Sequence, residues 1–132
     1  MENRTGILAA GNWIIDKIKI IDEFPHQDGL ANILDEQTNN GGAAYNVLKD
    51  LAKLKAKFPL YGCGLVGNDD NGRHILEDCK AHSINIEYLQ STSMAATSFT
   101  DVMSVKSNGR RTFFHQRGAN ALLSPDHIPL TT

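Results

Sequence analysis

Residues 39–46 read Asn-Asn-Gly-Gly-Ala-Ala-Tyr-Asn and join a polar turn to a helical pattern. The residues that we expect on the buried face of this helix include Val47, Leu48, Leu51 and Leu54. Glycines lack a Cβ atom and let a ligand approach the backbone, while the first turn of a helix offers unpaired N–H groups and the positive end of its dipole. The stretch is therefore either a binding site for a hydroxyl-rich or anionic ligand, or only a turn before a helix.

The composition is that of one folded globular domain. The 132 residues, 41% of them hydrophobic, suffice for a single core. Thirteen basic and 15 acidic residues give a formal charge of −2 without a long run of either sign, so we expect neither nucleic acid nor a membrane surface as a partner. The apolar run before Gly11 is too short for a membrane span and lacks the layout of a signal peptide, which predicts a cytoplasmic protein.

The cysteines and histidines indicate no disulfide and no metal site. Cys63 falls in an expected strand and Cys79 in an expected helix, where both are predicted to be small apolar residues. The five histidines show no ligand spacing with cysteine or carboxylate.

The order of the hydrophobic segments predicts an α/β fold. Residues 5–10 form a nearly continuous apolar run, which predicts a strand buried on both faces, and further strands are expected at 60–66 and 84–89. Helices are expected after Gly42 and after the turn cluster at 67–72. Strands alternating with helices in this way indicate an α/β sheet.

Other segments predict a β flap, or lid, outside the core. Residues 14–21 alternate as a half-exposed strand would, and a weaker strand is expected around residues 30–37. Asn108-Gly109 lies between two further strand patterns and is typical of a two-residue hairpin turn, in which both residues tolerate positive φ. Ser124-Pro125-Asp126 predicts the start of a helix.

Three polar residues have two interpretations each. Asp16, among isoleucines, is either a carboxylate that holds two sugar hydroxyls or a solvent-facing residue of a strand. Asn46 either contacts a polyol through its amide or caps the local backbone. Arg117 either clamps a carboxylate or phosphate, or is a surface arginine in a loop.

Two charged pairs are interpreted as structural. Asp69-Asp70, in Gly-Asn-Asp-Asp-Asn-Gly, has the composition of a turn and a helix cap. Arg110-Arg111 is expected at a solvated hairpin tip.

In their order along the chain, these motifs resemble the N-terminal half of the ribokinase-like (PfkB) family of sugar kinases. Each motif is short, but five in one order and at compatible spacings make a specific signal that covers nearly the whole chain. The matching segments are residues 11–16, 40–47 with 51–54, 64–69 with Gly72, the strand at Thr97, and 117–122 before Ser124-Pro125.

The resemblance implies a ribokinase-like α/β fold, with the N-terminal part of a central sheet flanked by helices and a small β lid that closes over a sugar or nucleoside. It implies that the carboxylate of Asp16 holds substrate hydroxyls, that the segment around Thr97 covers the pocket, and that Arg117 contacts an acidic sugar. The substrate-binding residues that it implies are Asp16, Gly41, Gly42, Asn46, Thr97, Phe99 and Arg117.

The activity that the resemblance implies is ATP-dependent phosphorylation of a sugar hydroxyl, with Mg²⁺. The family's Gly-Ala-Gly-Asp-like motif, which carries the catalytic base, and its ATP site belong to a C-terminal half that these residues do not contain. We therefore expect residues 1–132 to be the substrate-binding and lid half of a PfkB-type kinase domain, truncated before the ATP-binding half and inactive alone. The alternative is a non-catalytic sugar-binding module, or one that forms a homodimer through the lid.

The sequence departs from the family pattern in one further place. Lys55 stands where a glycine is expected, and Phe58-Pro59 lengthens the connection to the next strand. Both features concern the geometry of the same connection between the helix and the next strand.

Overall fold

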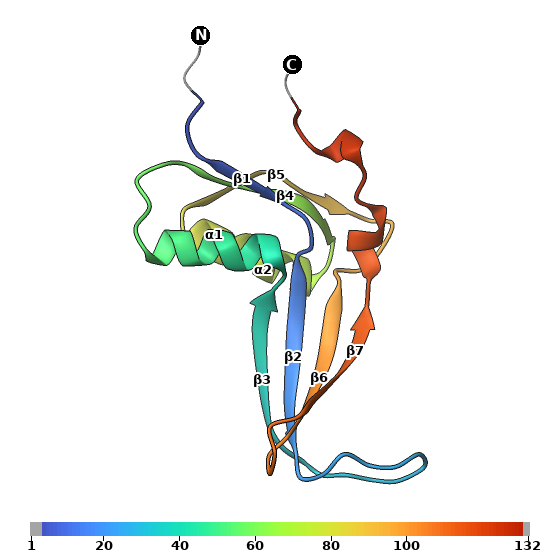
Figure 1. Ribbon diagram of the computed structural model, residues 1–132. Helices are drawn as coiled ribbons and strands as arrows, with labels where there is room; N and C mark the ends of the chain where they lie inside the picture. Colours follow the sequence, from blue (N-terminus) through green and yellow to red (C-terminus); the bar gives the residue numbers. More distant parts are fainter. Residues whose placement is uncertain (1–3, 131–132) are drawn as a thin grey trace.

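The computed structural model describes residues 4–130, in which two β-sheets are accompanied by helices (Figure 1). The first sheet is parallel, with the order β1-β4-β5, and consists of Ile7–Ala10, Leu60–Gly67 and Ile84–Thr92. The second, the lid sheet, has the order β3-β2-β6-β7 and consists of Ile33–Gly41, Ile14–Ile21, Phe99–Val105 and Arg111–Gln116. The helices are α1 (Ala43–Lys53), α2 (Asp70–Ala81) and the 3-10 helices η1 (Gly118–Leu122) and η2 (Pro125–His127). The predicted α/β fold with a lid is confirmed.

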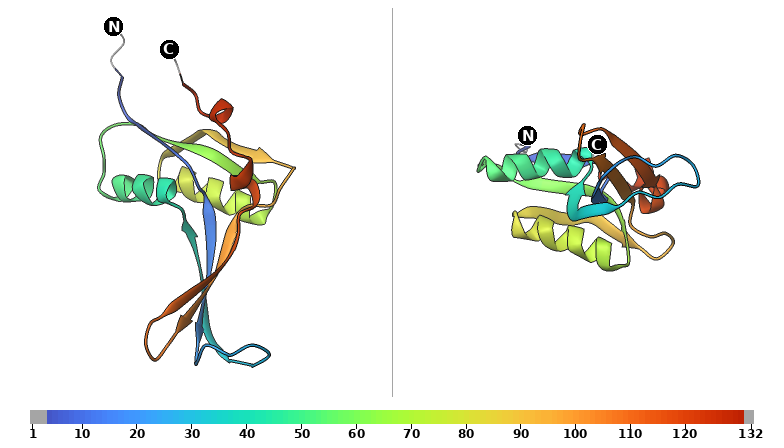
Figure 2. Two further views of the ribbon diagram at one scale, coloured as in Figure 1. Left: turned by 45° about the vertical axis from the view of Figure 1, so that its right-hand side comes forward. Right: turned by 90° about the horizontal axis from the view of Figure 1, so that it is seen from below.

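The lid sheet projects away from the parallel sheet, and both α-helices cover one face of the parallel sheet (Figures 1 and 2). The opposite face carries Leu8, Tyr61 and Tyr88, which line a shallow hollow beside Pro129. Leu8 is 39% exposed there. The prediction that the first strand is buried on both faces was therefore wrong, because helices cover only one face.

Trp13 occupies the centre of the core, between the two sheets. Its indole ring lies over two glycines of β4, where a Cβ atom at Gly62 would lie 2.8 Å from the ring and one at Gly64 would overlap it. The indole N–H donates to the backbone oxygen of Cys63 at 2.9 Å, and the ring is fully buried against the edge of Tyr45. The glycines that interrupt this apolar strand thus make room for one large side chain.

The face of α1 that is buried differs from the predicted one. Tyr45 and Leu48 are buried, whereas Val47 is 51% and Leu54 79% exposed. Because successive residues of a helix are about 100° apart, burial of Tyr45 beside Trp13 turns Val47 outward. The predicted inward positions of Val47 and Leu54 were wrong.

Side-chain hydrogen bonds join the base of the lid strands. The Asn120 side chain accepts from the backbone N–H of Trp13 and donates to its carbonyl, both at 3.3 Å. The Ser98 hydroxyl donates to the carbonyl of Arg117 and accepts from the N–H of Asn120 at 3.3 Å. The start of β2, the start of β6 and the end of β7 are therefore held together at one place.

The turn at Asn108-Gly109 differs from the prediction, whereas the turn at Lys55 keeps the left-handed backbone that a glycine would adopt. The β6–β7 hairpin is confirmed, but Val105 and Arg110 close a longer loop, in which Gly109 has φ of +68° and Asn108 does not have positive φ. The two-residue turn was therefore wrong. Lys55, where a glycine was expected, has φ of 58°, a conformation that costs a non-glycine residue roughly 1–2 kcal/mol.

Candidate functional site

Asp16 lies in β2, directly opposite Asn39 of β3 and Thr100 of β6. Its carboxylate sits over Gly41, where any Cβ atom would overlap it. Burial raises the pKa of Asp16 above its ordinary value, and the charge of His115 opposes that rise. Asp16 is thus a half-buried acceptor that needs the bare backbone of Gly41 beside it.

Gly42 is required for a different reason. Its φ is +99°, and a Cβ atom there would collide with the carbonyl oxygen of Asn12. Gly42 is also the N-cap of α1, and no side chain of the described residues caps this helix. The first-turn N–H groups of α1 therefore begin beside Asp16 and Gly41.

The structure does not bring all the sequence-predicted site residues to this place. Asn46 lies on the first turn of α1 with an exposed side chain, and Arg117, also exposed, precedes η1. Phe99 neighbours Thr100 along β6, so its side chain lies on the other face of the lid sheet, where Lys17 approaches its ring at 4.7 Å. Asp16, Gly41 and Gly42 are the members that adjoin one another.

Thr97 is fully buried, and its polar groups are already bonded within the protein. Its hydroxyl donates to Asp69 at 2.6 Å and accepts from the N–H of Gly67 at 2.8 Å, while its own N–H donates to Asp69 at 2.9 Å. Thr97 therefore positions the start of β6 against the turn between β4 and α2. The hydroxyl proton of Thr97 is therefore already used within the protein.

Asp69 caps α2, as the turn composition predicted, by accepting from the N–H of Gly72 at 2.8 Å. Burial alone would raise the pKa of Asp69, but hydrogen bonds from Thr97 and Gly72, together with the charge of Arg73, hold it below its ordinary value. The sequence could identify the cap, which is local, but not the bond to Thr97, which lies 28 residues away.

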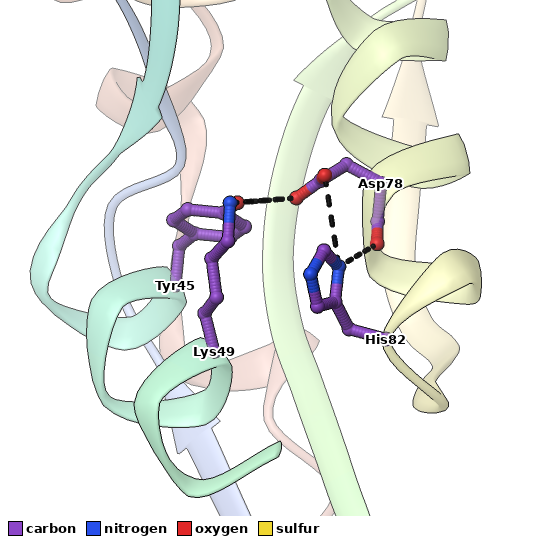
Figure 3. Close-up of polar contacts among 4 residues, drawn as sticks. All are labelled: Tyr45, Lys49, Asp78 and His82. Carbon is purple, nitrogen blue, oxygen red and sulfur yellow. Dashed lines mark hydrogen bonds and ion pairs between the residues drawn. The ribbon is translucent and has the colours of Figure 1, made fainter. Parts of the chain in front are cut away.

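A second polar cluster joins α1 to α2 (Figure 3). Tyr45 donates to Asp78, Lys49 donates to the Tyr45 oxygen at 2.5 Å, and His82 lies 3.6 Å from the Asp78 carboxylate. Burial, with Asp78 nearby, raises the pKa of Tyr45 so that its phenol stays protonated. The cluster is therefore a clamp between the two helices.

Residues 4–130 contain neither a metal-ligand cluster nor a membrane-spanning helix. In that range no three His, Cys, Asp or Glu side chains gather as a metal site would require. None of the helices described there is long and apolar enough to cross a membrane.

One protein-family model matches nearly the whole chain. The family model described as pfkB family carbohydrate kinase matches residues 4–131. Over 50 residues, 38% of this chain, the sequence is 50% identical to the bifunctional protein HldE of Helicobacter pylori (strain P12), of which the match covers 10%.

Solved structures of ribokinases share the fold. The ribokinase of Arabidopsis thaliana, solved with ribose and ATP, is 26% identical, with a TM-score of 0.75 over 86% of this chain. The ribokinase of Thermotoga maritima is 22% identical, with a TM-score of 0.84 over 96% of this chain. The chain spans only 36% and 41% of the lengths of these two structures.

Replacing Thr97 by valine tests its role as a positioning residue. We expect the free energy of unfolding at pH 7 to fall by about 1–3 kcal/mol, because the N–H of Gly67 and the carboxylate of Asp69 lose a buried partner. The pKa of Asp69 is lowered in the folded state, so its stabilisation is present above its unfolded pKa and disappears as pH falls through the folded pKa. The difference between wild type and variant should therefore be smaller at pH 3.

Urea denaturation at both pH values measures this difference. Thr112→Val, an exposed position of β7, is the matched control and should change stability by less than about 0.5 kcal/mol. An equal loss at pH 7 and pH 3 would show that the Thr97–Asp69 contact does not depend on the charge of Asp69.

Proposed function

The chain belongs to the PfkB family of carbohydrate kinases, and from this we propose that it supplies the sugar-binding half of an enzyme that transfers a phosphoryl group from ATP to a sugar hydroxyl. The observation that carries the proposal is the carboxylate of Asp16 seated on Gly41 at the start of α1. An ionised carboxylate beside bare backbone and unpaired helix N–H groups is suited to a ligand rich in hydroxyls.

In this proposal Asp16 accepts hydrogen bonds from two neighbouring sugar hydroxyls and fixes the orientation of the ring. Gly41 lets the carboxylate of Asp16 lie against the backbone, and Gly42 lets the chain pass Asn12 into α1, since a Cβ atom at either position would overlap these groups. Asn46, exposed on the first turn of α1, would add an amide that donates and accepts at the outer side of the site. Phosphoryl transfer depends chiefly on such positioning and on stabilising the charge of the transferred group.

We infer that ATP, Mg²⁺ and the catalytic base belong to a part of the enzyme beyond residues 1–132. The Arabidopsis ribokinase solved with ATP is longer, and this chain covers 36% of it. Mg²⁺ would neutralise charge on the transferring phosphate, but residues 4–130 offer no cluster of three ligands for it. A cytoplasmic location remains a prediction.

A second candidate function is homodimerisation through the lid. On the face of the lid sheet opposite Asp16, an apolar cavity of about 260 Å³ is lined by seven residues that include Phe24, Ile33 and Phe114. These three side chains are 50%, 52% and 54% exposed. Contiguous apolar surface of this kind is typical of an interaction site.

Asp16→Asn tests the proposed sugar site. We expect affinity for the bound sugar to fall by about 1.5–3 kcal/mol with an unchanged melting temperature, because the amide keeps the shape but loses the charged acceptor. Calorimetric titration against pentoses, hexoses, sugar acids and nucleosides measures the loss. Asp35→Asn is the control, since Asp35 lies opposite Ile20 on the same sheet and has no neighbouring diglycine. Equal affinities of wild type and Asp16→Asn would remove Asp16 from the site.

The same panel of sugars, with ATP and magnesium, tests whether phosphoryl transfer needs the C-terminal half as well as residues 1–132. We expect no sugar-dependent ADP formation by residues 1–132 alone, and formation when the C-terminal half is supplied. Turnover by this chain alone that Asp70→Asn abolishes would contradict the proposal.

Phe114→Gln tests the lid interface. Light scattering at high protein concentration should show association of the wild type and less of it in the variant. Phe58→Gln, outside the lid and 39% exposed, is the control. A wild-type protein that is monomeric at every concentration would exclude the lid dimer.

A further inference from the structure

One row of residues across the lid sheet is polar in all four strands. Asp16 of β2 is paired with Asn39 of β3 on one side and with Thr100 of β6 on the other, and Thr100 is paired with His115 of β7. Residues in direct register project from the same face of a sheet. The next row on that face, towards the lid tip, is different and consists of Gln37, Ile18, Val102 and Phe113. Polar side chains thus gather in the row that contains Asp16.

His115 is oriented by its neighbour in this row. The hydroxyl of Thr100 lies 2.8 Å from His115 Nδ1, while the histidine side chain as a whole is exposed. Nδ1 is therefore engaged, and Nε2 remains for a partner outside the sheet. Thr100 has a short side chain and is only 7% exposed, so it rises less from the sheet than Asp16 and His115 on either side of it.

The spacing of the row suits a single sugar ring. Strands β2 and β7 are separated by β6 alone, which places their backbones about 9.6 Å apart. Asp16 and His115 rise from the two sides of this interval, with Thr100 between them. A ring lying over Thr100 would be within hydrogen-bond reach of both side chains.

The charges on this face leave Asp16 as the principal partner of His115. Within the strands, the other charged residues on this face are Asp35 and Arg111, each four positions farther along its strand and therefore about 13 Å away. That distance exceeds the screening length at physiological salt. Beyond the end of β7, exposed Arg117 lies two residues after His115 and is a second positive charge, not an acidic partner. Strand β6, the sheet neighbour of β7, presents only uncharged residues on this face, namely Thr100, Val102 and Ser104.

We propose that His115 is a second sugar contact, carried by lid strand β7, which hydrogen-bonds the ligand from the side opposite Asp16. When protonated, His115 also favours the ionised form of Asp16. The identity of the ligand class rests on the proposed function, whereas the pairing of the two side chains does not. The competing explanation is that the Thr100–His115 bond only stabilises the edge of the lid.

The pairing is tested without any ligand by following the Asp16 carboxyl carbon in an NMR pH titration. His115→Gln keeps a polar side chain beside Thr100 but removes the charge, so the pKa of Asp16 should rise above its wild-type value. His74→Gln, on the exposed side of α2, is the matched control and should leave the titration unchanged. An Asp16 titration that is the same in His115→Gln and wild type would overturn the pairing.

The contact is tested by titrating the same proteins with the sugar panel between pH 5 and pH 8. For a sugar whose affinity depends on Asp16, His115→Gln should weaken binding about three- to tenfold at an unchanged melting temperature, the loss of one hydrogen bond. Because binding requires ionised Asp16, affinity should also start to fall at a higher pH in this variant than in wild type.

A sugar that is sensitive to Asp16→Asn and insensitive to His115→Gln at every pH would overturn the contact. If no sugar of the panel binds, the proposed function fails and the contact fails with it, while the Asp16 titration still decides the pairing.

Discussion

The position of Trp13 on the two glycines of β4 is the constraint on which the rest of the structure depends. Its indole ring fills the space above Gly62 and Gly64, and its N–H is bonded to the same strand. Its backbone is bonded twice to Asn120, which closes the base of the lid. Asp16 follows three residues later, in β2, so the residue that joins the two sheets also places the carboxylate.

What the sequence could predict was local. The alternation of strands and helices, the lid hairpin and the Asp69 cap follow from patterns within about ten residues, and all three are present in the structure. The partners of these elements were not predictable, because Trp13 meets β4 about 50 residues away and Thr97 meets Asp69 across 28. Nothing local in the sequence indicates that Gly62 and Gly64 of β4 lie against the ring of a tryptophan.

The candidate site was only partly accessible to the same reasoning. Asp16 by itself was more typical of a solvent-facing strand residue, and it was the family resemblance that singled it out. The resemblance also named Thr97, whose hydroxyl is bonded to Asp69 and Gly67 inside the protein. His115 carried no motif, since its relation to Asp16 exists only through the register of β2, β6 and β7.

The contact between Trp13 and β4 holds the lid in place. Residue-resolved hydrogen exchange of Gly64→Ala tests this role, because the atoms nearest the added methyl group are those of the Trp13 ring and the carbonyl of Gly11, neither of which lies in a lid strand. We expect faster exchange at the bases of lid strands β2 and β6 as well as in β4. Faster exchange confined to β4, with an unchanged lid, would contradict it.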